Sequence, residues 1–223
     1  MIKRISAILT ILTLAISGVL IIFWAPTDSA MGIVQKIMYI HVPAVWLTFL
    51  AFFVTFVYSI RYLWKREEYF DMVAYSTAEI GVLFCGLGLI TGSIWGKPTW
   101  NTYWTWDARL TTFLILFLIF VGYLLLRKYI HYGEKQARLA AIIAIIGTLD
   151  IPLIHQSVTW WRTLHQPSTM FSTKKSMIDV AMQTTLWISV LGFTFLFIYL
   201  TLSRVELEKK TRTYFKKIAS LHG

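Results

Sequence analysis

The sequence has few charged residues and almost no cysteine. Charged residues make up 14% of its 223 residues, about half of their share in an average soluble domain. Cys85 is the only cysteine, which excludes an internal disulfide and a four-cysteine metal site and favours plain packing at this position. Hydrophobic residues reach 57% and the mean hydropathy is +0.64. These values exclude a disordered chain and favour a polytopic membrane protein.

Six apolar runs are long enough, or nearly so, to cross a bilayer as helices, since about 20 helical residues span its hydrocarbon core. The expected helices cover residues 5–24, 37–60, 72–95, 110–126, 139–157 and 180–202. The first run resembles a signal peptide, but it is long for one and lacks a clear small-residue cleavage site. The sequence therefore predicts an all-α fold with one six-helix membrane domain over 1–223, a Trp-rich loop over 96–109 and a basic tail over 203–223.

Lysine and arginine are unevenly divided between the two ends of these helices. Fifteen lie near the termini or after the second and fourth helices, and six lie in the other loops. The first set is Lys3, Arg4, Arg61, Lys65, Arg66, Arg127, Lys128, Lys135, Arg138, Arg204, Lys209, Lys210, Arg212, Lys216 and Lys217; the second is Lys36, Lys97, Arg109, Arg162, Lys174 and Lys175. The positive-inside rule then predicts cytoplasmic termini. The net charge of +10 reflects this orientation rather than nucleic-acid binding, and the basic tail is expected to meet anionic lipid headgroups.

Aromatic residues gather in the loops predicted to lie outside. They are Trp95, Trp100, Tyr103, Trp104 and Trp106 after the third helix, and Trp160 and Trp161 after the fifth. An aromatic belt at the headgroup level explains one or two rings at a helix end. It does not explain several rings packed into one loop beside Asp107 and Arg109. The cluster therefore indicates a binding surface.

Three histidines lie near the same predicted face: His41 at the start of the second helix, His155 near the end of the fifth, and His165 in the loop that follows. Zinc needs three or four closely spaced ligands, and copper favours Met or Cys beside the histidine. Haem instead offers two axial positions for histidine, apolar faces for indoles, and propionates for Arg109, Arg162 or Lys97. The chain has no C-x-x-C-H motif, so the expected haem is non-covalent haem b.

Three segments resemble the tryptophan-rich WWD family of haem-handling proteins in cytochrome c biogenesis, and most closely its haem exporter protein C branch. They are WGKPTWNTYWTWDARLT from Trp95 to Thr111, YIHVPA around His41, and WWRTLHQ around His165. The order of these segments along the chain and the membrane side on which they are predicted to lie both match the family. One departure is Tyr103, where the family more often has tryptophan; tyrosine still provides a stacking ring.

The resemblance implies a function and assigns the site residues. His41 and His165 become the axial ligands of the haem iron, and the Trp motif becomes the haem platform. Family members hold haem at the outer, periplasmic face of the bacterial inner membrane and promote its covalent attachment to a membrane-tethered haem chaperone. They work beside ATP-binding cassette transporter subunits and a small single-span membrane protein. We therefore expect a haem-binding and delivery protein rather than a classical enzyme.

Two alternatives remain open. A b-type electron-transfer subunit usually places paired histidines inside facing helices. A permease component of a haem transporter would use intramembrane charges, and Glu79 and Asp150 are the candidates here. The chain has no G-x-x-x-x-G-K-[ST] motif for ATP.

Overall fold

The computed structural model describes residues 1–161, 163–165 and 179–222, and within these ranges the chain is helical with no β-strand. The elements are α1 (Ile2–Phe23), the 3₁₀ helix η1 (Ile33–Ile37), α2 (Met38–Lys65), α3 (Glu68–Trp100), α4 (Ala108–Tyr129), α5 (Glu134–Thr148), α6 (Asp150–Trp160) and α7 (Val180–His222). Among the described residues, six helical stretches are long and apolar enough to cross a membrane. The predicted all-α fold with six spans is confirmed.

The third helix is longer than predicted. α3 runs through Gly96 and Pro98 to Trp100, so the expected loop over 96–109 begins five residues late. Proline lacks the N–H that continues the helical ladder, and the helix ends two residues after it. Asn101 follows with a φ of 56°, a left-handed conformation that asparagine tolerates better than most residues. Trp100 therefore lies on a helix rather than in the loop.

The predicted fifth helix consists of two. α5 ends at Thr148 and α6 begins at Asp150, because Pro152 has no N–H to donate to the carbonyl one turn earlier. The predicted tail is also different, since α7 continues as a helix through it to His222. Salt bridges one turn apart, Glu206–Lys210 and Glu208–Arg212, both at 2.8 Å, support this polar extension.

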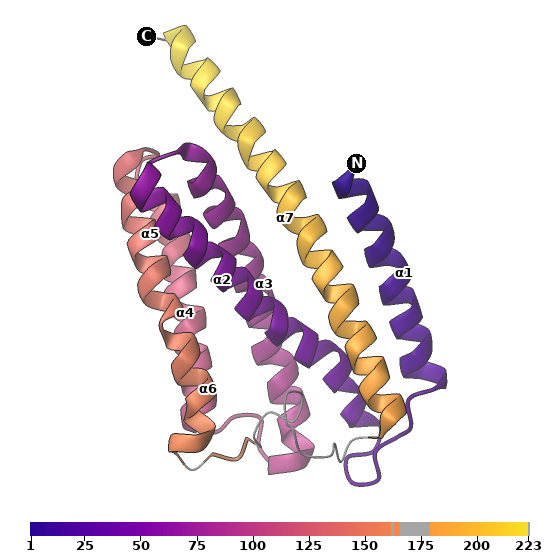
Figure 1. Cartoon of the computed structure of the whole chain (residues 1–223). Helices are drawn as coiled ribbons and strands as arrows, with labels where there is room; N and C mark the ends of the chain where they lie inside the picture. The colour runs from indigo at the N-terminus through magenta and orange to yellow at the C-terminus, as the bar shows by residue number, and fades with distance from the viewer. Residues whose placement is uncertain (162, 166–178, 223) are drawn as a thin grey trace.

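The bundle is built around the antiparallel pair α2 and α3 (Figure 1). The helices α4, α5 and α6 pack on one side of this pair, and α7 packs on the other with α1 beside it. Small residues let the helices approach closely, as in other membrane bundles. A Cβ at Gly81 would lie 2.4 Å from Phe52 Cε1, so only glycine admits the Phe52 ring, which stacks on Phe120 at 3.7 Å. The buried Cys85 packs in the same core.

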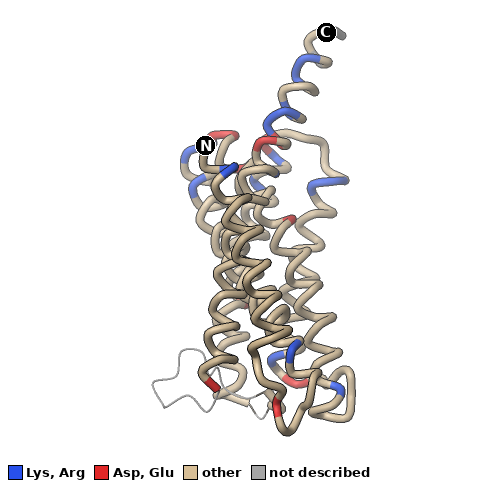
Figure 2. Tube along the Cα trace, turned by 90° about the vertical axis from the view of Figure 1, so that its right-hand side faces the viewer, with Lys and Arg blue, Asp and Glu red and all other residues tan. Residues whose placement is uncertain are grey.

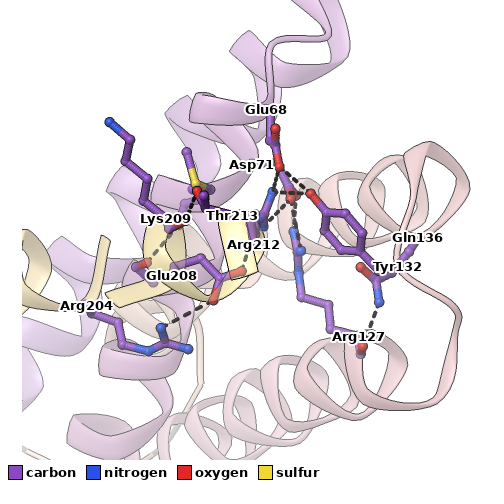
Figure 3. Close-up of polar contacts among 12 residues, drawn as sticks. Glu68, Asp71, Arg127, Tyr132, Gln136, Arg204, Glu208, Lys209, Arg212 and Thr213 are labelled. Atoms are coloured by element: carbon purple, nitrogen blue, oxygen red, sulfur yellow. Dashed lines mark hydrogen bonds and ion pairs between the residues drawn. The ribbon is translucent and has the colours of Figure 1, made fainter. Parts of the chain in front are cut away.

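Both chain ends lie at the same end of the bundle (Figure 1). Charged residues lie mostly near the two ends, and the middle is almost free of them (Figure 2). At the end with the termini, buried charges tie three helices together (Figure 3). Asp71 of α3, only 3% exposed, pairs with Arg127 of α4 and with Arg212 of α7, the latter at 2.8 Å. The extension of α7 is thus anchored to the bundle.

Tyr132, at the edge of this network, lies outside the spans. Tyr132 donates a hydrogen bond to Glu68 and accepts one from Arg212 at 3.1 Å. Burial and the hydrogen bond to Glu68 raise the pKa of Tyr132 to about 12. Deeper in the bundle, Glu79 pairs with Arg204 of α7 at 2.6 Å. The intramembrane carboxylate of Glu79 therefore has a structural partner.

Candidate functional site

A cavity lies between α2, α3, α4 and α6, toward the end of the bundle opposite the termini. Its volume is about 70 Å³ and it is open on one side. This is below the range of enclosed small-molecule sites, so a larger ligand would lie partly outside it. His41 and His165 both line it. The other lining residues are Val45, Phe49, Gly88, Leu89, Gly92, Ser93, Trp100, Trp104, Arg109, Leu110, Phe113 and Ile154. The wall is mainly apolar, with a few nitrogen-bearing side chains.

His41 lies in the first turn of α2 and faces α3. Its Nδ1 lies 3.1 Å from Thr91 Oγ1. Its ring packs against Gly92, where a Cβ would lie 2.9 Å from His41 Cε1. The indole of Trp95 meets the imidazole edge to face, with ring centroids 5.6 Å apart. Three residues of α3 therefore contact the ring.

His165 reaches the cavity from the segment after α6. Its backbone N–H donates to Thr163 Oγ1 at 2.8 Å, and its ring meets Trp100 edge to face at 5.0 Å. Burial and the nearby Arg109 guanidinium lower the pKa of His165 to about 4, although the Asp107 carboxylate opposes this shift. At neutral pH the imidazole is uncharged, so one ring nitrogen keeps a lone pair for a metal.

Only two tryptophans line the cavity, Trp100 and Trp104. The Trp104 indole meets Trp106 edge to face at 5.6 Å, and its Nε1–H is buried without a hydrogen-bond partner among the described residues. Trp95 lies behind His41, in a cluster with Met38, Tyr39 and Leu186. Trp100 and Trp104 thus form part of the cavity wall, whereas Trp95 packs against His41 outside the lining.

The remaining predicted platform residues lie outside the lining. Trp106 is 76% exposed and Tyr103 is 60% exposed. Trp160 and Trp161 are 61% and 53% exposed, and their rings contact each other at 5.8 Å. These four rings lie on the segments that also carry Trp104 and His165, and we call them the exposed aromatic surface.

Asp107 begins α4 as its N-cap. Its carboxylate accepts a hydrogen bond from the Leu110 backbone N–H at 2.9 Å and one from the Thr105 hydroxyl at 3.4 Å. Capping satisfies a donor that the helix itself leaves free. The cap places Arg109 in the first turn of α4, on the cavity wall. Arg109 forms no salt bridge with any residue in the described ranges.

The other predicted candidates lie elsewhere. His155 is exposed, with Nδ1 3.0 Å from the Ile151 carbonyl, and its ring packs on Phe49 at 4.9 Å, outside the cavity lining. Lys97 donates to the Asn101 carbonyl at 2.9 Å and lies over the Tyr103 ring. Arg162 lies outside the described residues. The structure therefore brings His165, and not His155, to the cavity with His41.

The donors that face the cavity fit a flat, apolar, anionic molecule with a metal at its centre. Two imidazoles suit axial positions, while Arg109 and the unpartnered Trp104 Nε1–H suit carboxylates. Across the described residues, no group of three or more His, Cys, Asp or Glu side chains is placed to hold a metal ion. The two imidazoles therefore suit a metal that arrives with other ligands, as haem iron does with its porphyrin.

Several residues in or next to the cavity were missed in the sequence. Gly88, Gly92 and Gly96 recur every fourth residue on α3 and admit Val45, His41 and Trp100, respectively, at close range. This spacing is the small-residue pattern of tightly packed membrane helices, so it carried a usable signal. Thr91 carried none, because a single threonine in an apolar helix has many roles.

Comparisons with known proteins identify the family to which this chain belongs. The heme exporter protein C family matches residues 1–219. Heme exporter protein C of Bradyrhizobium diazoefficiens is 40% identical over 184 residues, which are 82% of this chain and 70% of that protein. Its counterpart in Haemophilus influenzae is 38% identical over 210 residues, 92% of this chain and 85% of that protein.

A plant relative extends the comparison. A putative cytochrome c biosynthesis ccmC-like mitochondrial protein of Marchantia polymorpha is 39% identical over 175 residues, 78% of this chain and 74% of that protein. The chain therefore belongs to the heme exporter protein C family, whose multi-pass membrane proteins handle haem for cytochrome c maturation.

Proposed function

We propose that this protein binds haem b through His41 and His165 and presents it to a membrane-tethered haem chaperone. The observation that carries the proposal is that two histidines far apart in the sequence line one cavity with Trp100, Trp104 and Arg109. Each histidine has a firm support, Thr91 for His41 and Trp100 for His165. Supported imidazoles are the usual axial ligands of a haem iron.

Haem is the cargo of this site, and different side chains contact its iron, its ring and its propionates. The two imidazoles ligate the iron. The indoles of Trp100 and Trp104 and the ring of Phe113 contact the porphyrin, whose burial contributes about 25 cal/mol per Å². Arg109 and Trp104 Nε1–H receive the propionates, since a guanidinium matches a carboxylate in charge and geometry. The protein thereby holds haem without a covalent bond.

The exposed aromatic surface extends this platform beyond the cavity. Tyr103, Trp106, Trp160 and Trp161 lie on the segments that carry Trp104 and His165 but do not line the cavity. We assign these rings, with Trp95 behind His41 and Asp107 at the α4 cap, to the haem platform and to contact with the chaperone. Transfer then requires the chaperone's histidine to approach a haem edge that remains accessible at this surface.

Membrane orientation supports delivery on the periplasmic side. Both termini and most lysines and arginines lie at one end of the bundle (Figure 2), and positive loops favour the cytoplasm. We propose that the cavity end faces the periplasm, with the protein in the bacterial inner membrane beside ATP-binding cassette transporter subunits and a small single-span protein. A reporter fused after Trp106 should be active only on the periplasmic side; cytoplasmic activity would reject this orientation.

The ligand pair is tested by the absorption spectrum of the purified protein. We expect six-coordinate low-spin haem in the wild type, and high-spin haem in both His41→Ala and His165→Ala. His155→Ala is the matched control and should keep the wild-type spectrum, because His155 lies outside the cavity. Pyridine haemochrome of the extracted cofactor checks that it is haem b. An unchanged spectrum in either of the first two variants removes that histidine from the iron.

A further inference from the structure

His41 has a hydrogen-bond partner on the neighbouring helix that haem ligation by itself does not explain. Its Nδ1 lies 3.1 Å from Thr91 Oγ1 of α3. His41 lines the cavity, whereas Thr91 does not. Thr91 thus lies one contact behind the imidazole, in the position from which a side chain orients a metal ligand.

The hydrogen bonds around Thr91 determine which nitrogen of His41 carries the proton. The Thr91 hydroxyl donates to the Leu87 carbonyl at 2.7 Å. A hydroxyl has one proton and two lone pairs, so toward His41 it acts as an acceptor. With that proton on the Leu87 carbonyl, the tautomer that fits is the one in which His41 Nδ1 donates and Nε2 keeps a free lone pair.

The neighbouring residue controls the position of the same ring. A Cβ at Gly92 would lie 2.9 Å from His41 Cε1, closer than real Cβ contacts allow, and 3.4 Å from Nδ1. Any residue other than glycine would therefore push the imidazole away from α3. Thr91 and Gly92 together determine both the direction and the depth of the ring.

We propose that Thr91 is the positioning residue of the His41 ligand: it accepts the Nδ1–H proton, directs Nε2 to the iron, and strengthens its donation. This inference rests on the proposed haem ligation by His41. A hydrogen bond from the second nitrogen makes imidazole a better donor, and a better donor favours ferric over ferrous iron. Loss of the bond should therefore weaken haem binding and make the midpoint potential more positive.

The test is Thr91→Val, which keeps the shape of the side chain and removes the acceptor. We expect haem affinity, measured by transfer to a competing apo-haem protein, to fall roughly 10- to 100-fold, as for other residues that support metal ligands. The midpoint potential of the remaining haem should be more positive than in the wild type. Thr91→Ser keeps the acceptor and should restore both values.

A matched control separates positioning from a general helix effect. Thr48 of α2 is fully buried and donates to the Ala44 carbonyl at 3.0 Å, without contacting the cavity. Thr48→Val should leave the potential and the affinity unchanged. Gly92→Ala retains every hydrogen-bonding group but displaces the ring, so it should also weaken haem binding. Thr91→Ala removes the same acceptor if Thr91→Val does not accumulate in membranes.

The outcomes distinguish this inference from the proposed function. If His41→Ala turns the haem high-spin but Thr91→Val and Thr91→Ala keep the wild-type potential and affinity, Thr91 has no positioning role and the ligand assignment stands. If His41→Ala leaves the spectrum unchanged, His41 is not a ligand, and the inference fails with the proposed function.

Discussion

At the scale of single residues, the cavity separates tryptophans that the sequence presents as one cluster. Trp104 lines the cavity, while Trp106, two residues later, is 76% exposed. An indole that covers roughly 100 Å² of porphyrin contributes about 2.5 kcal/mol, or somewhat less than a hundredfold in affinity. The effect of losing either ring on haem affinity should therefore depend on its position in the fold and not on its residue type.

We therefore predict that Trp104→Ala weakens haem binding roughly 10- to 60-fold, whereas Trp106→Ala changes it less than about threefold, as expected for an exposed contact. Titration against a competing apo-haem protein measures both. Chaperone loading in the same variants shows whether Trp106 acts in transfer instead. A larger loss of haem affinity in Trp106→Ala would show that the exposed part of the platform contributes more to haem binding than the part that lines the cavity.

Arg109 offers a second prediction at this scale, because it faces the cavity and lacks a salt-bridge partner among the described residues. A hydrogen bond to a charged group contributes about 1.5–3 kcal/mol. Arg109→Gln should therefore weaken haem binding roughly 10- to 100-fold. Haem dimethyl ester, which has no propionate charge, should bind the wild type and Arg109→Gln equally. A difference between them would show that Arg109 does not act on the propionates.

At the scale of helices, Asp107 acts as the N-cap of α4 and carries Arg109 into place. Replacing an N-cap carboxylate with alanine costs about 0.5–2 kcal/mol, while asparagine caps almost as well. Asp107→Ala should thus lower the thermal unfolding temperature and weaken haem binding, and Asp107→Asn should preserve both. If Asp107→Asn lost haem while its thermal unfolding temperature stayed normal, the carboxylate charge itself would be needed for haem binding.

Helix ends also show where sequence patterns stop being informative. Apolar length predicts a span but not its end, because polar residues continue a helix when their side chains pair along it. The extension of α7 shows this: Glu208 pairs with Arg212 one turn later, and Arg212 pairs with Asp71 on another helix. Pro98 shows that a proline does not by itself give the end of a helix, since α3 continues for two residues after it.

At the scale of the whole molecule, the two ends of the bundle have separate tasks. The buried ion network joins α3, α4 and α7 at the end with the termini (Figure 3), and the cavity lies toward the other. Asp71→Ala leaves Arg127 and Arg212 buried without this carboxylate, and breaking such a pair costs about 3–5 kcal/mol. Mutations at distant sites usually have additive effects on stability, so this loss should not alter the cavity.

We predict that Asp71→Ala lowers the amount and thermal stability of the folded protein, while the protein that remains keeps the wild-type haem spectrum. Glu206→Gln is the matched control: its pairs with Lys3 and Lys210 lie at the surface, and such pairs contribute little. Fluorescence-detected size-exclusion after heating gives the stability. A changed spectrum in Asp71→Ala would show that the two ends are coupled.

The sequence by itself determined the six spans, the two ends to which charged and aromatic residues belong, and the candidate histidines, because a bilayer imposes length and polarity on every segment. Only the tertiary structure decided which candidates meet. His41, Trp104, Arg109 and His165 come from separate segments, and helix packing brings them to one cavity while it leaves His155 and Trp106 outside. The glycine spacing on α3 indicates a close approach, but which side chain each glycine meets, such as His41 at Gly92, follows from three-dimensional shape.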